Sequence, residues 1–394
     1  MILCLCFRQQ GIEMIKKLNK KRVLIVLYYY HPYVSGVSVY AKQVAEGLQS
    51  SGYEVTILTS QFDKNLPVHE LVDGIKVIRR PVLFRLGKGV IMPFFWLDVV
   101  SYARASDFVN VHLPLADTGL SSLFIPRNKM ITTYHCDINL GFTLIEKLVT
   151  AVSMLLMKVQ LWRSAVVVPT TIDYFDSSKM KSFSAKAVPI LPPIDETRFT
   201  PTPSTQLFDS LHIKKTDVVV GFLGRIVYEK GINYLLKSID YLKKEFDSIK
   251  IVIVGDYENI AGGGVKEELD NYVRLYPDVI TFTGFLEDPQ RNEFYSGIDV
   301  FVLPSIDPLE AFGMVQVEAM LCGAPVVATD MPGVRQVILQ TGYGRICRVK
   351  DAEDLAKNIA IVVKNPEKYK PDRKEVAKKF GLKNSIHDYE KLLT

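Results

Sequence analysis

Hydrophobic positions along the chain fall into two alternating patterns. Short runs of apolar, mostly β-branched residues predict buried strands, and stretches with apolar residues three or four positions apart predict helices between them. The predicted strands of the first half are residues 23–27, 55–59, 75–78, 108–111, 130–133, 165–168 and 188–191, and its helices include 37–49, 93–105 and 144–162. This alternation is typical of parallel α/β units.

A proline-rich segment at residues 189–194 interrupts the pattern, and Pro201 and Pro203 follow it, which indicates a domain boundary. The alternation then restarts at residues 218–223, a run that is apolar on both faces, as in a buried parallel strand. Further strands are predicted at 251–254, 280–282, 300–303, 326–328 and 346–349, and a last helix near 385–393. The predicted fold class is α/β, with two doubly wound Rossmann-like domains facing each other across a cleft.

The boundaries divide the chain into four parts: residues 1–20, 21–194, 195–374 and 375–394. Residues 1–20 form a basic leader or a loose extension, and we expect residues 1–13 to be an extension or a misassigned start before Met14. The last part is the C-terminal helix.

Composition excludes several classes of protein. The 394 residues carry 48 Lys+Arg against 43 Asp+Glu, and this net charge of +5 falls short of the clustered excess of a nucleic-acid binder. Hydrophobic and charged fractions of 48% and 23% exclude a mainly disordered chain. Five scattered cysteines indicate a reducing compartment and a cytoplasmic protein, without zinc-ligand spacing. The most apolar stretch, residues 148–162, contains Lys158 and is too short to predict a membrane span.

Two cations follow the strand predicted at 218–223. Gly224-Arg225 and Lys230-Gly231 frame a turn before a helix, and a guanidinium and an ammonium near a helix N-terminus suit a bound diphosphate. The alternative is that both are solvated loop charges. We assign no role to Glu229, which lies between them.

Two glutamates follow the strand predicted at 300–303. Glu310 precedes a helix that starts near Gly313, and Glu318 lies inside it. Eight helical residues span roughly 12 Å, whereas the carboxylate pair of a glycoside hydrolase needs about 5–9.5 Å. The spacing suits two hydroxyl-binding points along an elongated ligand. A solvated helix residue is the alternative for Glu318.

The N-terminal half offers weaker candidates. The loop with Ser35 and Gly36 follows the first strand and permits close backbone approach to an anion at the next helix. His135 follows the strand at 130–133 and is a candidate for the cleft, although a structural role is the commoner one for a lone histidine and is the default for His112.

Missing motifs narrow the chemistry. The chain lacks Gly-x-Gly-x-x-Gly and the P-loop, which disfavours a dinucleotide-dependent dehydrogenase and a P-loop NTPase. It also lacks Asp-x-Asp, so a metal-clamped nucleotide diphosphate has no obvious ligands. We therefore expect protein cations, and no metal, at the diphosphate.

Three motifs together resemble family 4 retaining glycosyltransferases, the group 1 glycosyltransferases of the GT-B fold. They are Gly224-Arg225 with Lys230-Gly231, the Glu310-x7-Glu318 pair, and residues 322–330 leading to Pro332-Gly333. The resemblance extends over nearly the whole chain from about Arg22. The loop at Ser35-Gly36 departs from the usual Gly-Gly, and residues 255–264 are longer than the family's usual short turn.

The resemblance implies a site. Arg225 and Lys230 would bind the departing diphosphate, Glu310 the sugar hydroxyls and Glu318 the ribose hydroxyls. His135 would lie by the transferred sugar. The remaining donor-binding positions that the resemblance implies are Gly36, Gly224, Phe312, Gly313, Met314 and Val315.

The resemblance also implies an activity. Residues 21–194 would form the acceptor domain, residues 195–374 the nucleotide-sugar donor domain, and residues 375–394 a helix crossing back to the first. The enzyme would move a hexose-type sugar, such as mannose, from a UDP-, GDP- or ADP-sugar to a glycan or lipid-linked acceptor with retention, and it would require no cofactor. Another GT-B enzyme of nucleotide-sugar metabolism and a noncatalytic GT-B scaffold are the alternatives.

Membrane contact has two candidate segments. Residues 84–96 mix two cations with large apolar side chains. This pattern fits a segment that lies on an anionic membrane surface or lines the path of a lipid-linked acceptor, and the alternative is a loop running into a buried helix. Basic residues just before the first strand add positive charge consistent with peripheral contact on the cytoplasmic membrane face: Lys16, Lys17, Lys20, Lys21 and Arg22.

Overall fold

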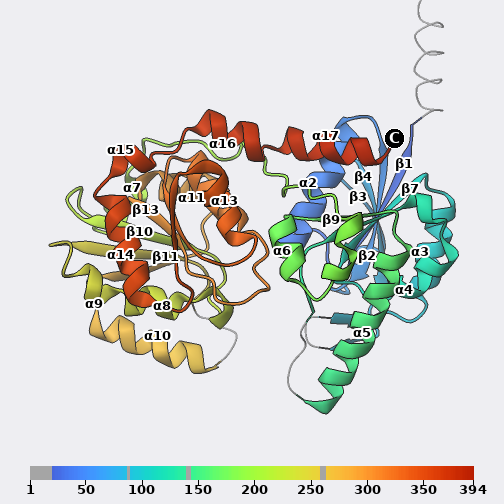
Figure 1. The fold of residues 1–394 in the computed structure, drawn as a ribbon, viewed down its shortest axis with the longest axis horizontal. Coiled ribbons are helices and arrows are strands. Elements are labelled where there is room, and N and C mark those ends of the chain that lie inside the picture. The colour runs from blue at the N-terminus through green and yellow to red at the C-terminus, as the bar shows by residue number, and fades with distance from the viewer. Residues whose placement is uncertain (1–19, 87–88, 139–142, 258–262) are drawn as a thin grey trace, which may run out of the picture. The chain divides into compact units, whose positions relative to one another are not determined.

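The computed structural model describes residues 20–86, 89–138, 143–257 and 263–394, and the chain divides into two compact units (Figure 1). The N-terminal unit takes in the chain up to Pro169 together with Lys179–Ile190 and Ser385–Thr394. The C-terminal unit consists of Thr170–Ser178 and Leu191–Asn384. The predicted extension 1–13 and most of the basic leader lie outside the described residues.

The N-terminal unit is built on a seven-stranded sheet of order β3-β4-β2-β1-β7-β8-β9. Its strands are β1 (Arg22–Val26), β2 (Glu54–Gln61), β3 (His69–Val72), β4 (Ile75–Pro81), β7 (Phe108–Leu113), β8 (Met130–Tyr134) and β9 (Val166–Pro169). All neighbours are parallel except β3, which pairs antiparallel with β4. The central strand β1 is buried from Val23 onward, as its unbroken apolar run predicts.

Helices join these strands. They are α2 (Gly36–Ser50), α3 (Phe95–Arg104), α4 (Thr118–Ser121), η1 (Ser122–Phe124), η2 (Arg127–Lys129), α5 (Leu144–Arg163) and η3 (Lys181–Lys186). Thr143 begins α5 because its hydroxyl accepts the Glu146 N–H while the Glu146 carboxylate accepts the Thr143 N–H. A short hairpin of β5 (Phe84–Leu86) and β6 (Gly89–Ile91) precedes α3.

The strand predicted at 188–191 is wrong. Only Ala187 forms an isolated bridge, to Val167, and the chain then leaves the sheet after two further backbone hydrogen bonds, from Val188 and Ile190. Prolines at 189, 192 and 193 lack the N–H groups that a continued strand needs. Strand β3 and the hairpin were not predicted, because they are short and only partly buried.

The C-terminal unit is built on a fully parallel six-stranded sheet of order β12-β11-β10-β13-β14-β15. Its strands are β10 (Val218–Leu223), β11 (Ile249–Val254), β12 (Ile280–Gly284), β13 (Val300–Leu303), β14 (Val326–Thr329) and β15 (Gly344–Cys347). All six match predicted strands to within a few residues. The carboxyl ends of β10 and β13, which are direct neighbours, carry the two motifs with the candidate cations and glutamates.

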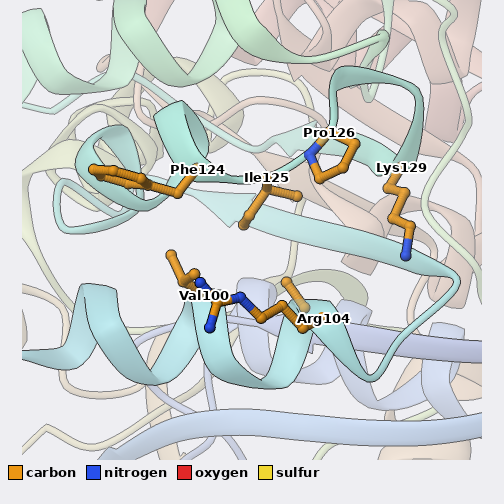
Figure 2. Close-up of a pocket in the computed structure, with 7 residues that line it drawn as sticks. Val100, Arg104, Phe124, Ile125, Pro126 and Lys129 are labelled. Carbon is orange, nitrogen blue, oxygen red and sulfur yellow. The ribbon is translucent and has the colours of Figure 1, made fainter.

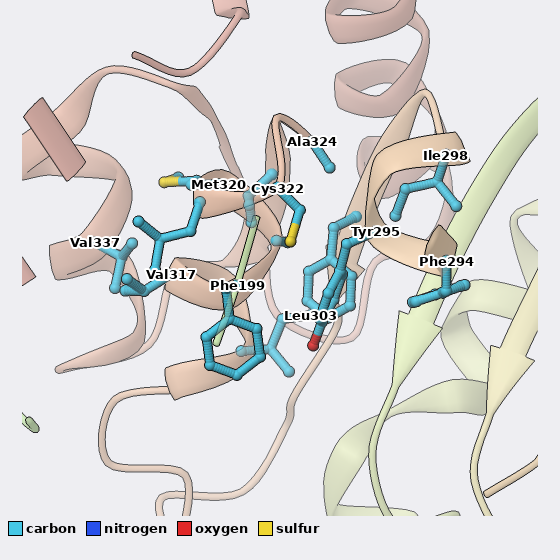
Figure 3. Packing of buried hydrophobic residues seen from close by; sticks show 14 of the residues in the cluster. Phe199, Phe294, Tyr295, Ile298, Leu303, Val317, Met320, Cys322, Ala324 and Val337 are labelled. Atoms are coloured by element: carbon cyan, nitrogen blue, oxygen red, sulfur yellow. The ribbon is translucent and has the colours of Figure 1, made fainter. Parts of the chain in front are cut away.

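The C-terminal unit also contains helices. They are α6 (Ile172–Ser177), α7 (Gln206–Ser210), η4 (Tyr228–Lys230), α8 (Ile232–Lys237), α9 (Ile239–Leu242), α10 (Gly263–Leu275), α11 (Asp288–Gly297), α12 (Met314–Leu321), α13 (Val334–Thr341), α14 (Ala352–Val363), α15 (Pro366–Tyr369) and α16 (Arg373–Phe380). The last helix, α17 (Leu382–Leu392), lies mostly in the N-terminal unit. Figure 3 shows part of the core, in which Val317 and Met320 of α12 pack in one cluster with Tyr295 and Phe199.

Two segments belong to a different compact unit from the residues next to them in the sequence. Thr170–Ser178 belongs to the C-terminal unit, so that unit differs here from the predicted domain of residues 195–374. Asp173 explains the difference, because its carboxylate accepts hydrogen bonds from Gly333 and Arg335. The end of the chain, Ser385–Thr394, belongs to the N-terminal unit, where Tyr389 is buried and its hydroxyl bonds Tyr40 and Thr133.

Candidate functional site

The loop after β10 presents Arg225 to solvent. Gly224 donates its N–H to Val254 at 3.0 Å, which fixes the start of the loop against β11. The Arg225 side chain is exposed and has no hydrogen bond or ion pair within the described part of the chain. A guanidinium that is held at the carboxyl edge of a parallel sheet but is not neutralised is available to an anionic ligand.

Lys230 and Glu310 come together in the same region. The Lys230 ammonium and the Glu310 carboxylate form an ion pair, and 20% and 15% of the two side chains are exposed. Two backbone features hold their loops side by side. The Ile306 N–H donates to the Glu229 carbonyl at 2.9 Å. Gly231 has φ +67°, and a Cβ there would lie 2.0 Å from the Pro304 carbonyl oxygen, so only glycine allows this approach.

The loop from Pro304 to Gly313 ends at the start of α12. Gly313 occupies the N-cap position with φ +79°, and a Cβ would lie 2.4 Å from Leu303. Phe312 is buried in the core, whereas Met314 and Val315 are half-buried. The predicted helix start near Gly313 is confirmed, and the first amides of α12 follow directly on the loop that carries Glu310.

Glu318 lies on α12 and is half-buried. Its carboxylate accepts a hydrogen bond from the Tyr295 hydroxyl at 2.9 Å. Burial raises the pKa of Glu318, and the charge of Arg291 and the Tyr295 hydrogen bond oppose that rise. The side chain is thus not a freely solvated helix residue, although Tyr295 and Arg291 of α11 were not singled out from the sequence.

Residues of α6 and of the turn before it support the loop that carries Glu310. The Tyr174 hydroxyl donates to the Pro308 carbonyl at 2.9 Å, and the Thr170 hydroxyl donates to the Ala311 carbonyl at 3.3 Å. Asp173 accepts from Gly333 N at 3.0 Å and from Arg335 Nε at 2.9 Å. Nothing in the sequence pairs these residues with a loop more than a hundred positions away.

The loop before α2 is organised by its own serines. Ser35 caps α2, because its hydroxyl accepts the Ser38 N–H at 3.2 Å while Ser38 Oγ accepts the Ser35 N–H at 2.8 Å. The Ser38 hydroxyl also donates to the Tyr33 carbonyl. Gly36 is the first residue of the helix and is exposed. The cap therefore uses one of the first-turn donors and leaves the N–H groups of Gly36 and Val37 at the exposed helix start.

His135 and His112 form a buried pair in the N-terminal unit. His112 Nδ1 and His135 Nε2 lie 2.9 Å apart, and the His135 ring meets Tyr40 edge to face at 4.8 Å. Burial lowers the pKa of His135 to about 3, and burial with the neighbouring histidine lowers the pKa of His112 well below its ordinary value. Both rings are therefore neutral near pH 7, and one must donate to the other. The sequence singled out both histidines but not their contact.

No group of three or more His, Cys, Asp or Glu side chains arranged to hold a metal ion occurs among the described residues. Over the same ranges no helix has both the length and the apolar character to cross a bilayer. The candidate anion site consists of Arg225, Lys230 and the backbone around α12, with Glu310 on the loop before that helix and Glu318 on it.

The chain matches two family models. The model described as "Glycosyl transferases group 1" matches residues 203–380, and the model described as "Glycosyltransferase Family 4" matches residues 34–171. A phosphatidyl-myo-inositol mannosyltransferase of Mycobacterium leprae is 25% identical over 338 residues, 84% of each chain. A human relative, which is one component of the phosphatidylinositol N-acetylglucosaminyltransferase, is 25% identical and covers 80% of this chain and 63% of that protein.

Solved structures share the fold. Sucrose-phosphate synthase from Thermosynechococcus elongatus superposes with a TM-score of 0.72 at 19% identity, over 95% of this chain and 98% of that chain. Anabaena HepE in complex with UDP-glucose gives a TM-score of 0.71 at 18% identity, over 94% and 99%. The predicted pair of Rossmann-like domains and the predicted glycosyltransferase class are confirmed. The chain belongs to the group 1 glycosyltransferases of family 4 and has the GT-B fold.

Proposed function

We propose that this enzyme transfers a hexose-type sugar from a nucleotide-diphosphate donor to a lipid-linked or glycan acceptor with retention of anomeric configuration, without a metal. One observation carries the proposal. Lys230 and Glu310, which the family resemblance assigns to the diphosphate and to the sugar hydroxyls, form an ion pair, and Arg225 is exposed on the same loop as Lys230. In the donor, one oxygen atom joins the sugar to the diphosphate, so the groups that bind the two parts must lie close together.

The chemistry follows from the charges. Breaking the anomeric C–O bond leaves positive charge on the sugar ring and negative charge on the departing diphosphate. Preorganised cations at the diphosphate therefore stabilise the transition state more than the ground state. In this proposal Arg225 and Lys230 receive the diphosphate, the amides at the start of α12 donate to it, and Glu310 accepts from sugar hydroxyls. Glu318 accepts from the ribose, while Tyr295 fixes its carboxylate.

We propose a lipid-linked acceptor on the basis of the relatives. The mycobacterial and human relatives carry phosphatidylinositol in their names. Recognition of such an acceptor by the N-terminal unit, and peripheral contact with a membrane, belong to this proposal. Gly36 and His135, both in that unit, are its candidate contacts with the donor phosphate and the transferred sugar.

The test is a thermal-shift panel of UDP, GDP and ADP and their sugar conjugates. One nucleotide series should raise the melting temperature, because a ligand at 100 times its Kd adds about 2.7 kcal/mol of stability. Arg225→Ala should abolish most of that shift. Arg274→Ala, which removes another exposed arginine, on α10, should retain it. The proposal fails if no nucleotide diphosphate shifts the wild type, or if both variants respond alike.

A further inference from the structure

The outer face of α5 is apolar and uncovered. Residues three, four or seven positions apart lie on one face of a helix. On α5 five such residues are 85, 66, 49, 62 and 58% exposed: Leu144, Leu148, Val152, Leu155 and Trp162. We call these five residues the outer stripe. The opposite face of the helix is buried, at Ser153, Met157, Gln160 and Leu161. A helix that is apolar all round is normally covered on every side, so the outer stripe needs a partner.

Neighbouring elements also carry exposed apolar side chains. A Cβ at Gly119 of α4 would lie 2.4 Å from the Leu156 carbonyl oxygen, so the backbones of α4 and α5 touch. Helix α4 in turn packs on α3 (Figure 1). These elements add exposed apolar side chains at Phe94, Leu97, Leu120, Leu123 and Phe124.

A pocket of about 180 Å³ separates α3 from the segment around Phe124. Figure 2 shows Phe124 and Ile125 on one side of it and Val100 with Arg104 on the other. The exposed apolar area therefore includes a recess that an acyl chain or an apolar side chain can enter.

Charge indicates what covers this surface. Lys147 and Lys158 of α5 are exposed and lie within three or four positions of outer-stripe residues, and Arg104 and Lys129 line the pocket. The carboxylate of Glu146, the only acidic residue of α5, bonds back to the N–H of Thr143. An apolar face edged by cations complements an anionic lipid surface.

The positions of the tryptophans also favour a lipid surface. The chain has two, and both belong to this surface. Trp162 is exposed on the outer stripe, and Trp96 of α3 lies 5.8 Å from Phe124 between ring centroids. Tryptophan is enriched where a protein meets the boundary between lipid and water.

We propose that α5, together with the exposed residues of α3, α4 and η1, docks on an anionic bilayer surface with the helix lying in the plane of the interface. This surface would make the membrane contact that belongs to the proposed function. Only the lipid-linked nature of the acceptor is taken from that function. A second copy of the chain is the competing occupant, but a symmetric contact of two outer stripes would bring their lysines together.

Vesicle sedimentation tests the proposal without donor or acceptor. Wild type should bind vesicles of phosphatidylcholine with phosphatidylglycerol more strongly than vesicles of phosphatidylcholine alone, and its tryptophan emission should shift to shorter wavelength. Leu148→Glu combined with Leu155→Glu should lower binding about tenfold or more. Leu339→Glu, at an exposed leucine of α13 in the other unit, should leave binding unchanged.

A second variant guards against loss of folding. Lys147→Glu combined with Lys158→Glu changes only exposed charges and should remove the preference for anionic vesicles. The proposal is overturned if wild type does not bind anionic vesicles, or if folded variants bind as it does. It is also overturned if light scattering shows a dimer that the leucine variant dissociates while vesicle binding persists. Thermal shifts with nucleotides should be equal in all these proteins, so failure of docking is distinguishable from failure of the proposed donor site.

Discussion

Lys230 and Glu310 form an ion pair across 80 positions of sequence, and both side chains are mostly buried. The pair joins the loops that follow two neighbouring strands, β10 and β13, and the hydrogen bond from Ile306 to Glu229 reinforces the junction. Each charge compensates the other at a position of low solvent exposure. In the proposed reaction, a bound donor inserts its phosphate and sugar beside a pair whose geometry already exists.

This pair predicts different effects for its two members. Glu310→Gln removes the negative charge but preserves shape, so the affinity for the nucleoside diphosphate should be retained while kcat/KM for transfer falls about 100-fold to 1,000-fold. Lys230→Ala should weaken both, because it removes the cation and leaves Glu310 unpaired. Calorimetric titration with the nucleoside diphosphate and initial-rate kinetics check the two parts. Equal loss of diphosphate affinity in both variants would contradict the separate roles.

Replacing Arg225 should lower the activity of the enzyme without lowering its stability. Its side chain makes no hydrogen bond or ion pair with the described residues, so Arg225→Ala should change the free energy of unfolding by less than about 0.5 kcal/mol. Transition-state stabilisation should fall by about 2–4 kcal/mol. Denaturation curves and kcat/KM measured on the same preparation check this. Added guanidinium should restore part of the activity of Arg225→Ala and none of the activity of Lys230→Ala.

Features that depend on neighbouring residues could be predicted from the sequence, whereas features that depend on contacts between distant residues could not. Strands β10, β11, β13 and β14 were predictable because each is a short, mostly apolar run, and local pattern decides burial there. Residues 188–191 look equally apolar, but the prolines at 189, 192 and 193 lack the N–H groups that would continue the pairing after Val188 and Ile190. The site motifs were found because they sit directly after strands. Tyr174 and Tyr295 were not, because their importance arises from tertiary contacts with Pro308 and Glu318.

The contacts of Asp173 with Gly333 and Arg335 should stabilise the fold less at low pH. Burial alone would raise the pKa of this carboxyl, but hydrogen bonds from Arg335, Gly333 and Gln336 outweigh burial and lower it below the ordinary value of 3.8. A lowered carboxyl pKa stabilises the fold above the ordinary pKa, and that contribution is lost as the pH falls through the lower folded value. Asp173→Asn should therefore unfold at lower denaturant than wild type at pH 7, and the difference should shrink below pH 4.

A matched control variant separates the effect of the Asp173 contacts from the effect that acid has on any carboxylate of the protein. Asp209 of α7 is exposed, and its bond to Thr205 is local. Asp209→Asn should show a small difference in stability with little dependence on pH. If its curve follows that of Asp173→Asn, the contacts of Asp173 with Arg335 and Gly333 do not cause the effect.

The His112–His135 pair predicts a second pH dependence, at higher pH. Burial lowers the pKa of both rings, that of His135 to about 3, whereas an unfolded histidine titrates near 6.5. The unfolded chain therefore binds more protons between these values, so stability is full above about pH 7 and decreases as the pH falls. Each histidine contributes a slope of up to about 1.4 kcal/mol per pH unit.

His112→Gln isolates that contribution. Glutamine is neutral throughout and retains a hydrogen-bonding group for His135, so the loss of stability between pH 6.5 and 5 should be about half that of wild type. His387→Gln, at an exposed position of α17 in the same unit, provides the control and should keep the full slope. Urea denaturation monitored in the N-terminal unit at several pH values measures both. If the stability of His112→Gln falls with pH as steeply as that of wild type, then His112 does not remain neutral in the folded protein. The two facing nitrogens would then not have one proton between them.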